Sequence, residues 1–256
     1  MVTIDQMWLA ERARELKAGI LFLTRLRYGA SEPVDGAMIG RAAWAFAVAG
    51  LLVGVVGAVV YGLAYHVGLP GWPAAALAVA ATMTLTGCLH EDGLADTIDG
   101  FGGGKTREQK LVIMRDSRIG TYGVCALTIA ILLRVSALAL LGATGPVAAA
   151  LLAAHGAGRA VMPVFMAFLP PARRDGLSAS AGQPLYGGVA AAAVLGVLIL
   201  MLCLGFGHGL VALIVLAIAT VLLAWLSLDQ IGGQTGDVLG AVEQVSEIAI
   251  LLVALW

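Results

Sequence analysis

Charged residues are scarce in this chain of 256 residues. Asp, Glu, Lys and Arg together make up 12% of it, whereas 60% of the residues are hydrophobic. A soluble domain carries about twice that share of charge and cannot bury so much apolar surface. The composition therefore excludes an ordinary soluble domain and predicts an integral membrane protein.

Charge is missing altogether from two long stretches. No Asp, Glu, Lys or Arg occurs in the 49 residues between Arg41 and Glu91, or in the 53 residues between Asp175 and Asp229. Each stretch holds two helices of about 20 residues and a turn, and such a helix crosses ~30 Å of hydrocarbon. The apolar runs are continuous and do not alternate with a period of two, which favours helices over a β-barrel.

Cysteine is also rare. The three cysteines, Cys88, Cys125 and Cys203, lie in apolar stretches without a CxxC or Cys/His spacing. This pattern favours a packing role over a disulfide or a zinc site. The first turns carry several charges and no continuous apolar core, so we expect no cleaved signal peptide.

We predict an all-α, polytopic integral membrane helix bundle of about seven transmembrane helices in a single membrane domain, residues 1–256. An amphipathic helix at 8–26, within an N-terminal cytoplasmic segment 1–41, is expected to lie at the membrane interface. The expected spans, separated by Gly- and Pro-containing turns, are residues 42–65, 72–89, 123–142, 146–169, 187–205, 209–227 and 238–256.

The placement of basic residues predicts the orientation. Basic residues precede the first expected span, fill the connection after the second and follow the fourth: Arg12, Arg14, Lys17, Arg25, Arg27, Arg41, Lys105, Arg107, Lys110, Arg115, Arg118, Arg173 and Arg174. The connections after the first, third and fifth spans contain none. By the positive-inside rule, the N-terminus, segment 90–122 and loop 228–237 face the cytoplasm, and we expect a multi-pass protein of the cytoplasmic (inner) membrane.

The segment with the most functional information, GCLHEDGLADTIDGFGGG, follows directly on an apolar span. On a helix, Asp92, Asp96 and Asp99 fall within about 60° of one another. Such close carboxylates repel unless a cation holds them, and oxygen ligands beside a phosphate substrate favour Mg²⁺. A solvated acidic helix face is the alternative. Glu91 points about 100° away from Asp92, which argues against a ligand role.

Two neighbouring groups suit phosphate chemistry. His90 is either a hydrogen-bonded structural residue or a general base beside a phosphoryl site. In the run Arg115, Asp116, Ser117, Arg118, two guanidiniums flank a carboxylate and a hydroxyl. Arginine forks bind phosphate oxygens, so we expect this cluster to bind a diphosphate near the metal; topogenic charge in a surface turn is the alternative.

A third polar segment, GGQTGDVLGAVEQVSE, lies near the C-terminus. It places Gln234, Thr235 and Asp237 at the expected start of a helix, where we expect contacts with substrate and, for Asp237, with the metal. Glu243 and Glu247 continue along that helix. Carboxylates in a membrane helix are expensive and usually functional, although for these two a polar seam that joins the helix to the bundle is an equal alternative.

Two arginines fall inside apolar spans and therefore need partners. Arg134 is expected to form a structural ion pair. Arg159 lies nearer the cytoplasmic end, one turn after His155, and is expected to contact a substrate phosphate.

The strings LHEDGLADTIDGFGG, IMRDSRIGTYG and IGGQTGDVLGAVEQVSE, with FLTRL at 22–26, resemble the signature segments of the cobalamin-5′-phosphate synthase family, also called adenosylcobinamide-GDP ribazoletransferase. The resemblance covers nearly the whole chain. It implies a Mg²⁺-dependent transferase that joins adenosylcobinamide-GDP to α-ribazole, or its 5′-phosphate, and releases GMP. The family often has an apolar residue at the Glu91 position.

With this chemistry, the site residues take the following roles: His90, Asp92 and Asp96 catalytic; Asp92, Asp96, Asp99, Asp116 and Asp237 at the metal; Arg115, Ser117, Arg118, Arg159, Gln234 and Thr235 at the substrates. The expected partners are the two substrates and the lipid bilayer, with no nucleic acid. A homo-oligomer or an association with other cobalamin-assembly enzymes is also expected.

Two rival functions remain. DGLAD is similar to the opening motif of the CDP-alcohol phosphotransferases, but that family has Arg after the Ala, where this chain has Asp96. A cation-coupled transporter would carry its acids in the middle of spans, whereas here they cluster at span ends.

Overall fold

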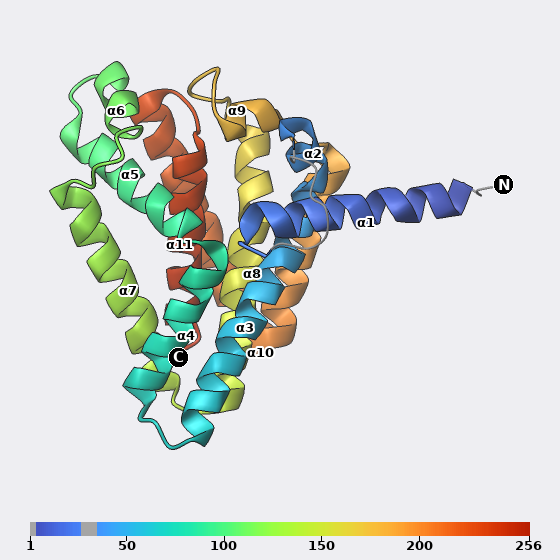
Figure 1. Cartoon of the computed structure of the whole chain (residues 1–256), viewed down its shortest axis with the longest axis vertical. Coiled ribbons are helices and arrows are strands. Elements are labelled where there is room, and N and C mark those ends of the chain that lie inside the picture. The colour runs from blue at the N-terminus through green and yellow to red at the C-terminus, as the bar shows by residue number, and fades with distance from the viewer. Residues whose placement is uncertain (1–3, 27–34) are drawn as a thin grey trace.

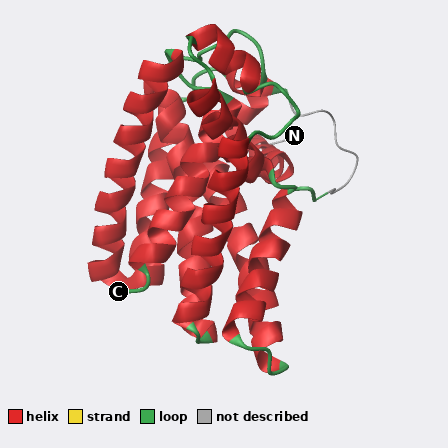
Figure 2. Ribbon diagram, turned by 90° about the vertical axis from the view of Figure 1, so that its left-hand side faces the viewer, coloured by secondary structure: helices red, strands yellow, loops and turns green. Residues whose placement is uncertain are grey.

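The computed structural model describes residues 4–26 and 35–256, so Arg27, counted above among the basic residues, lies outside the described part. Within that part the elements are helices: α1 Ile4–Leu23, α2 Gly36–Arg41, the 3-10 helix η1 Ala42–Ala45, α3 Phe46–His66, α4 Gly71–Thr86, α5 Leu89–Gly103, α6 Arg107–Ile113, α7 Thr121–Leu141, α8 Thr144–Phe168, α9 Leu177–Ala181, α10 Tyr186–Ile231 and α11 Gly236–Val253. The prediction of an all-α membrane bundle is confirmed (Figures 1 and 2).

The count of seven spans is not confirmed. Among the described residues, four helical stretches are long and apolar enough to cross a membrane: Gly36–His66, Thr121–Leu141, Thr144–Phe168 and Tyr186–Ile231. A fifth is added if α4 and the bent α5 form one broken span. Two of the expected spans do not qualify. Helix α4 has only 16 residues, short of the roughly 20 needed, and α11 carries three carboxylates.

The long helix α10 contains a break that divides it into two arms. Gly205 has φ 75° and ψ 167°, outside the helical range. A methyl group on Gly209 would lie 3.0 Å from the carbonyl oxygen of Leu200. Nine residues of straight helix would separate these two by about 13 Å, so the arms must fold back on each other. The break falls between the expected spans 187–205 and 209–227.

Helices α3 and α8 pack with their backbones in contact. A methyl group on Gly50 would overlap the carbonyl oxygen of His155, and one on Gly54 would lie 2.8 Å from that of Leu151. Small residues at such a crossing are the usual way for membrane helices to approach closely. The close approach buries α8 along most of its length and makes it the central helix of the bundle.

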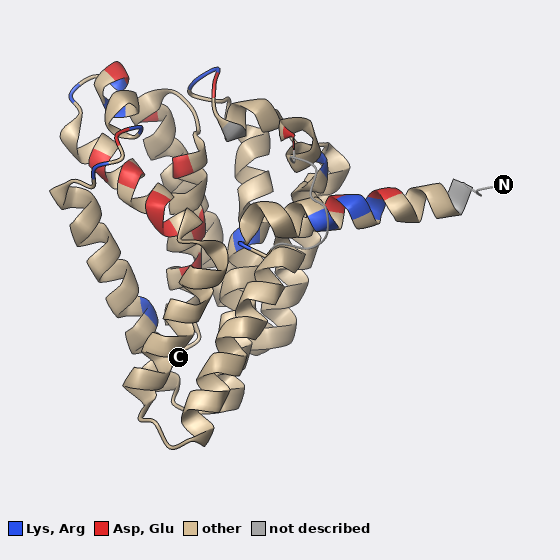
Figure 3. Ribbon diagram, in the orientation of Figure 1, with Lys and Arg blue, Asp and Glu red and all other residues tan. Residues whose placement is uncertain are grey.

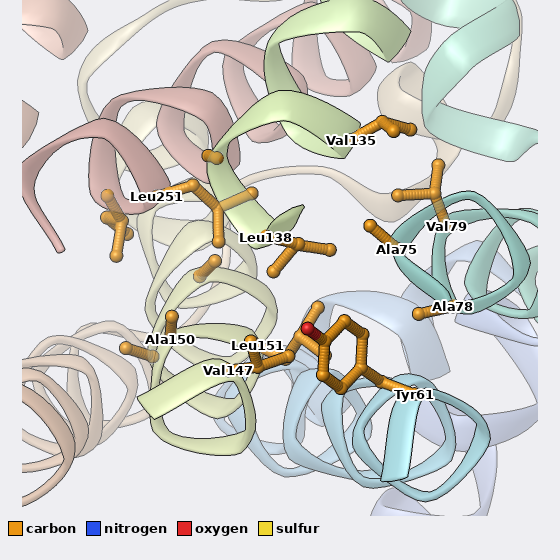
Figure 4. Packing of buried hydrophobic residues seen from close by; sticks show 14 of the residues in the cluster. Tyr61, Ala75, Ala78, Val79, Val135, Leu138, Val147, Ala150, Leu151 and Leu251 are labelled. Carbon is orange, nitrogen blue, oxygen red and sulfur yellow. The ribbon is translucent and has the colours of Figure 1, made fainter. Parts of the chain in front are cut away.

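A hydrophobic cluster fills the half of the bundle that is distant from the charged loops. Tyr61, Leu138 and Leu151 lie at its centre, each at most 1% exposed, with α3, α4, α7 and α8 around them (Figure 4). The hydroxyl of Tyr61 donates a hydrogen bond to the carbonyl oxygen of Gly142, 3.3 Å away. That bond satisfies the polar end of an otherwise apolar side chain.

Charged residues gather toward the end of the bundle that carries α5, α6 and α9, and the opposite end is free of them (Figure 3). Helix α1 crosses the bundle and projects beyond it (Figure 1). Its buried Glu15 accepts a hydrogen bond of 2.7 Å from the indole nitrogen of Trp44, whereas Met7, Trp8 and Leu9 are more than half exposed. An apolar segment that projects sideways fits the expected interfacial helix.

A buried ion network joins the four helices α5, α7, α8 and α11. The guanidinium of Arg134 on α7 lies 3.0 Å from Glu91 on α5 and 3.2 Å from Glu247 on α11. His155 on α8 lies 3.2 Å from the other oxygen of Glu247. Arg159, one turn along α8, pairs with Glu243. The expected structural role of Arg134 and the polar-seam alternative for Glu243 and Glu247 agree with this arrangement.

Replacing Arg134 by Met should destabilise the protein strongly, because Glu91 and Glu247 would stay buried without their cation. Removal of one partner from a buried pair costs about 3–5 kcal/mol. Thermal unfolding of the purified protein in detergent measures the loss. Arg118→Met is the matched control, since Arg118 is 86% exposed and should tolerate the same change. Equal melting temperatures for the two variants would contradict a stabilising role of the network.

Candidate functional site

The site begins at a sharp bend between α4 and α5. Gly87 (φ 66°) and Cys88 (φ 58°) both have left-handed backbone conformations, and the axes of the two helices differ by 88°. Glycine adopts this conformation without strain, which explains its presence at the first position. The bend turns α5, and with it the acidic segment, away from the direction of α4.

Helix α5 lies directly against α11 through two glycines. A methyl group on Gly93 would lie 2.7 Å from the carbonyl oxygen of Asp237 and 3.1 Å from the Cα of Gly240. One on Gly240 would in turn lie 3.1 Å from the carbonyl oxygen of His90. This close approach brings the acidic segment and the C-terminal polar segment, about 140 residues apart in sequence, to one place.

A cavity opens where these two helices meet. Its polar lining includes His90 and Asp92 from α5, Arg173 and Asp175 from the loop after α8, and Asp237 from the start of α11. Asp96, one turn after Asp92, lies near enough to both Asp92 and Asp237 for their negative charges to repel. Of the five predicted metal ligands, Asp92 and Asp237 line this cavity, whereas Asp96 does not.

Local contacts orient Asp237. Thr235 caps α11 by accepting a hydrogen bond from the backbone nitrogen of Val238, and its hydroxyl lies 3.2 Å from a carboxylate oxygen of Asp237. Arg173 approaches the same oxygen to 3.5 Å. Gln234, 2% exposed, accepts a hydrogen bond from the hydroxyl of Ser178. Gln234 and Thr235 thus line the cavity, and their contact with substrate stays a prediction.

Arg173 is a site residue that the sequence did not reveal, because it was counted only among the topogenic charges. Two backbone hydrogen bonds of 2.8 Å pair Pro170 and Ala172 with Gln234, and they bring the loop that carries Arg173 to α11. Arg107 donates hydrogen bonds to the carbonyl oxygens of Ala172 and Ile231, which ties both loops to α6. The available signal was a basic residue two positions after Pro171.

Asp99 lies at the other side of α5. It is 7% exposed, and its two oxygens accept hydrogen bonds from the backbone nitrogens of Gly120 (2.7 Å) and Gly123 (2.9 Å) at the start of α7. A carboxylate at a helix N-terminus satisfies unpaired N–H groups and interacts favourably with the helix dipole. The structure thus places the Asp99 carboxylate against the start of α7 and outside the cavity lining.

The Arg-Asp-Ser-Arg run lies in an exposed turn. Arg118 bonds Asp116 through its backbone and its guanidinium, at 2.6 Å for the closest contact. These hydrogen bonds lower the pKa of Asp116 to about 2. Arg115 pairs with Asp175 at the cavity rim, whereas Asp116, Ser117 and Arg118 do not line the cavity.

His90 connects the cavity to the ion network. It is 1% exposed, and its Nδ1 lies 3.3 Å from the guanidinium of Arg159 and 3.8 Å from Glu243. Its Nε2 is buried and has no hydrogen-bond partner. Arg159 was expected to contact substrate, but it is 1% exposed, pairs with Glu243 and His155, and does not line the cavity.

Two groups of side chains among the described residues offer possible metal ligands. His155, Glu243 and Glu247 offer ligand atoms that lie within 4.8 Å of one another, but Arg134 and Arg159 already pair with these carboxylates. Among the described residues, the ligand atoms of Asp92, Asp96 and Asp237 do not all lie within 4.8 Å of one another, but these carboxylates offer only oxygen, and of the three only Asp237 forms an ion pair, with Arg173. Oxygen-only donors beside an orphan imidazole nitrogen fit Mg²⁺.

A helical membrane protein with an acidic, oxygen-rich cavity at one end of its bundle is the class that fold and site define. The family model described as cobalamin-5-phosphate synthase matches residues 15–255, so the chain belongs to that family.

Curated relatives carry the name adenosylcobinamide-GDP ribazoletransferase. The protein from Bradyrhizobium diazoefficiens is 57% identical over 94% of this chain and 92% of its own length. The one from Mesorhizobium japonicum is 52% identical over 92% and 90%. The one from Azorhizobium caulinodans is 45% identical over 93% and 94%. No solved structure matches the chain.

Replacing Gly93 by Ala should disrupt the site, because the added methyl group would push α5 away from Asp237 and Gly240. We expect transferase activity to fall by at least tenfold and the affinity for Mn²⁺, a spectroscopic substitute for Mg²⁺, to weaken. Gly62→Ala on α3 is the control, since a methyl group there meets nothing within 4 Å. Unchanged Mn²⁺ binding in Gly93→Ala, measured by electron paramagnetic resonance, would show that the helix contact does not build the site.

Proposed function

We propose that this chain is a membrane transferase that joins adenosylcobinamide-GDP to α-ribazole, or to its 5′-phosphate, and releases GMP. The relatives' printed name supports these substrates. The observation that carries the proposal is the contact between Gly93 and Gly240, which brings Asp92, Asp237 and the free nitrogen of His90 to one cavity. Neither rival function, that of a CDP-alcohol phosphotransferase or that of a cation-coupled transporter, has support of this kind.

In the reaction, a free ribose hydroxyl of α-ribazole forms a bond to the cobinamide-side phosphorus of the diphosphate; the 5′ oxygen is not the attacking group, because it carries the phosphate in the 5′-phosphate substrate. The bond from that phosphorus to the oxygen of the departing GMP breaks. Charge on the phosphoryl oxygens and on GMP must be offset for this exchange to proceed, and a bound Mg²⁺ supplies that compensation. Asp92, Asp96 and Asp237 are the residues that would hold the ion. Asp116, which the sequence predicts as a further ligand, lies in an exposed turn outside the cavity and pairs with Arg118.

Two kinds of side chain act on the substrates directly. His90 Nε2 accepts the proton of the attacking hydroxyl, since this nitrogen has no hydrogen-bond partner among the described residues and its residue lines the cavity. Arg173 and Arg115 lie at the cavity and its rim, and with Arg118 they bind the diphosphate oxygens. Gln234 and Thr235 shape the wall beside Asp237. Asp99 and Arg159 lie outside the cavity and hold the helices that carry these side chains in position.

Replacing Asp96 by Asn should abolish Mg²⁺-dependent GMP release, with a loss of at least 100-fold in kcat, because one oxygen ligand loses its charge. The assay follows GMP and the joined product at saturating Mg²⁺. Asp229→Asn is the control, since Asp229 is an exposed carboxylate at the end of α10. Full Mg²⁺-dependent turnover by Asp96→Asn would remove the central metal ligand from this mechanism.

The site is proposed to face the cytoplasm from the inner membrane. The basic residues of α1, of the loop around α6 and of the loop after α8 lie at the end of the bundle that carries the cavity (Figure 3). The connections at the other end, residues 67–70 and 142–143, carry no charge. This asymmetry supports an N-terminus and a cavity on the cytoplasmic side.

Cysteine labelling tests the orientation. In a variant without Cys88, Cys125 and Cys203, a membrane-impermeant maleimide should label Gly145→Cys on intact spheroplasts and Lys105→Cys only on inverted vesicles. Both positions are exposed, and each lies at one end of the bundle. The reverse labelling pattern would place the site outside the cytoplasm.

A further inference from the structure

The cavity has two chemically different walls. Part of its lining is polar and is formed by His90, Asp92, Arg173 and Asp237. Another part is formed by six side chains without N–H or O–H groups: Phe22, Ile39, Phe46, Met162, Met166 and Leu239. We call these six the apolar wall. They come from α1, α2, α3, α8 and α11, so the fold assembles this surface from five separate elements.

Most of the apolar wall is buried within the bundle. Ile39, Phe46, Met162 and Met166 are each at most 4% exposed and belong to one hydrophobic cluster. The ring of Phe22 packs against that of Phe46 with 5.9 Å between centroids. Rings and thioethers in such a wall favour a flat aromatic ligand, because aromatic pairs and sulfur–aromatic contacts both add to the burial of apolar area.

The short helices α2 and α9 close the cavity above this wall. A methyl group on Gly40 of α2 would lie 2.6 Å from the carbonyl oxygen of Ala181 at the end of α9, so the two backbones are in contact. Ser178, Ala179 and Ala181 of α9 line the cavity. Helix α9 therefore contributes to the lining of the cavity together with the apolar wall.

We propose that the apolar wall binds the aromatic base of the riboside substrate, an assignment that rests on the proposed function. The diphosphate is anionic and suits the polar part of the lining, whereas ribazole is a riboside of a benzimidazole that carries two methyl groups, a flat and apolar base. With the base against Met166 and Phe46, the ribose extends toward His90 and Asp92. The same wall then determines which lower base the enzyme accepts.

The apolar wall should discriminate between the bases of different ribosides in two ways. Each methyl group of the base that the wall contacts contributes roughly tenfold or more to kcat/KM. A purine with an exocyclic amino group would lose its hydrogen bonds to water and find no acceptor on the six side chains of the wall, which disfavours it further. Dimethylbenzimidazole riboside should therefore be preferred over benzimidazole riboside, and that in turn over adenine riboside.

The test measures kcat and KM of the full-length enzyme for these three ribosides at saturating adenosylcobinamide-GDP. We expect Met166→Ala to raise the KM for dimethylbenzimidazole riboside at least tenfold and to reduce the preference for the methylated base. Its kcat and its KM for adenosylcobinamide-GDP should change by less than threefold. Met201→Ala on α10 removes the same volume outside the cavity and should behave as the unaltered enzyme.

A second variant and a binding measurement distinguish a loss of riboside binding from misfolding of the variant. Phe22→Leu alters the half-buried end of the wall and should shift the preference in the same direction, and calorimetric titration with the free dimethylbenzimidazole riboside should show the same loss of affinity. If both variants form product with the base preference and riboside affinity of the unaltered enzyme, the assignment is overturned while the proposed function stands. If the unaltered enzyme forms no product from any riboside, both are overturned.

Discussion

The buried ion network is the constraint on which the rest of the structure depends. Arg134 on α7 and Arg159 on α8 each need an anion in an apolar bundle, and α5 and α11 supply these anions through Glu91, Glu243 and Glu247. Unpaired charges are far more costly in such surroundings than at a surface, so the four helices can pack only in the arrangement that pairs them. That arrangement also fixes α5 against α11, where the cavity lies.

The network and the cavity share a member, His90. Its Nδ1 faces Arg159 and Glu243, while its Nε2 is left without a partner. A ring held on one side by buried charges has little freedom to rotate, which is the kind of preorganisation that catalytic groups require. The apolar bundle therefore contributes more than membrane anchoring, because its internal charges set the geometry of the polar end.

Much of this could be predicted from the sequence, because charge-free runs report helices and local motifs report chemistry. The helical class, the family and the structural role of Arg134 followed in this way. Three features did not follow, since they depend on which helices touch. Asp99 shares the predicted stripe with Asp92 but faces α7. Arg159 pairs with Glu243 instead of lining the cavity. Arg173 reaches Asp237 only because backbone pairing joins two distant loops.

The shortness of α4 has a consequence for the electrostatics of the reaction centre. Its 16 residues rise about 24 Å, less than the ~30 Å of hydrocarbon, before the chain bends into α5. A helix of this length that starts at the far interface places the acidic segment below the level of the lipid headgroups. Water is depleted there and the effective dielectric falls, so every attraction between the carboxylates, an ion and a diphosphate becomes stronger than it would be on an open surface.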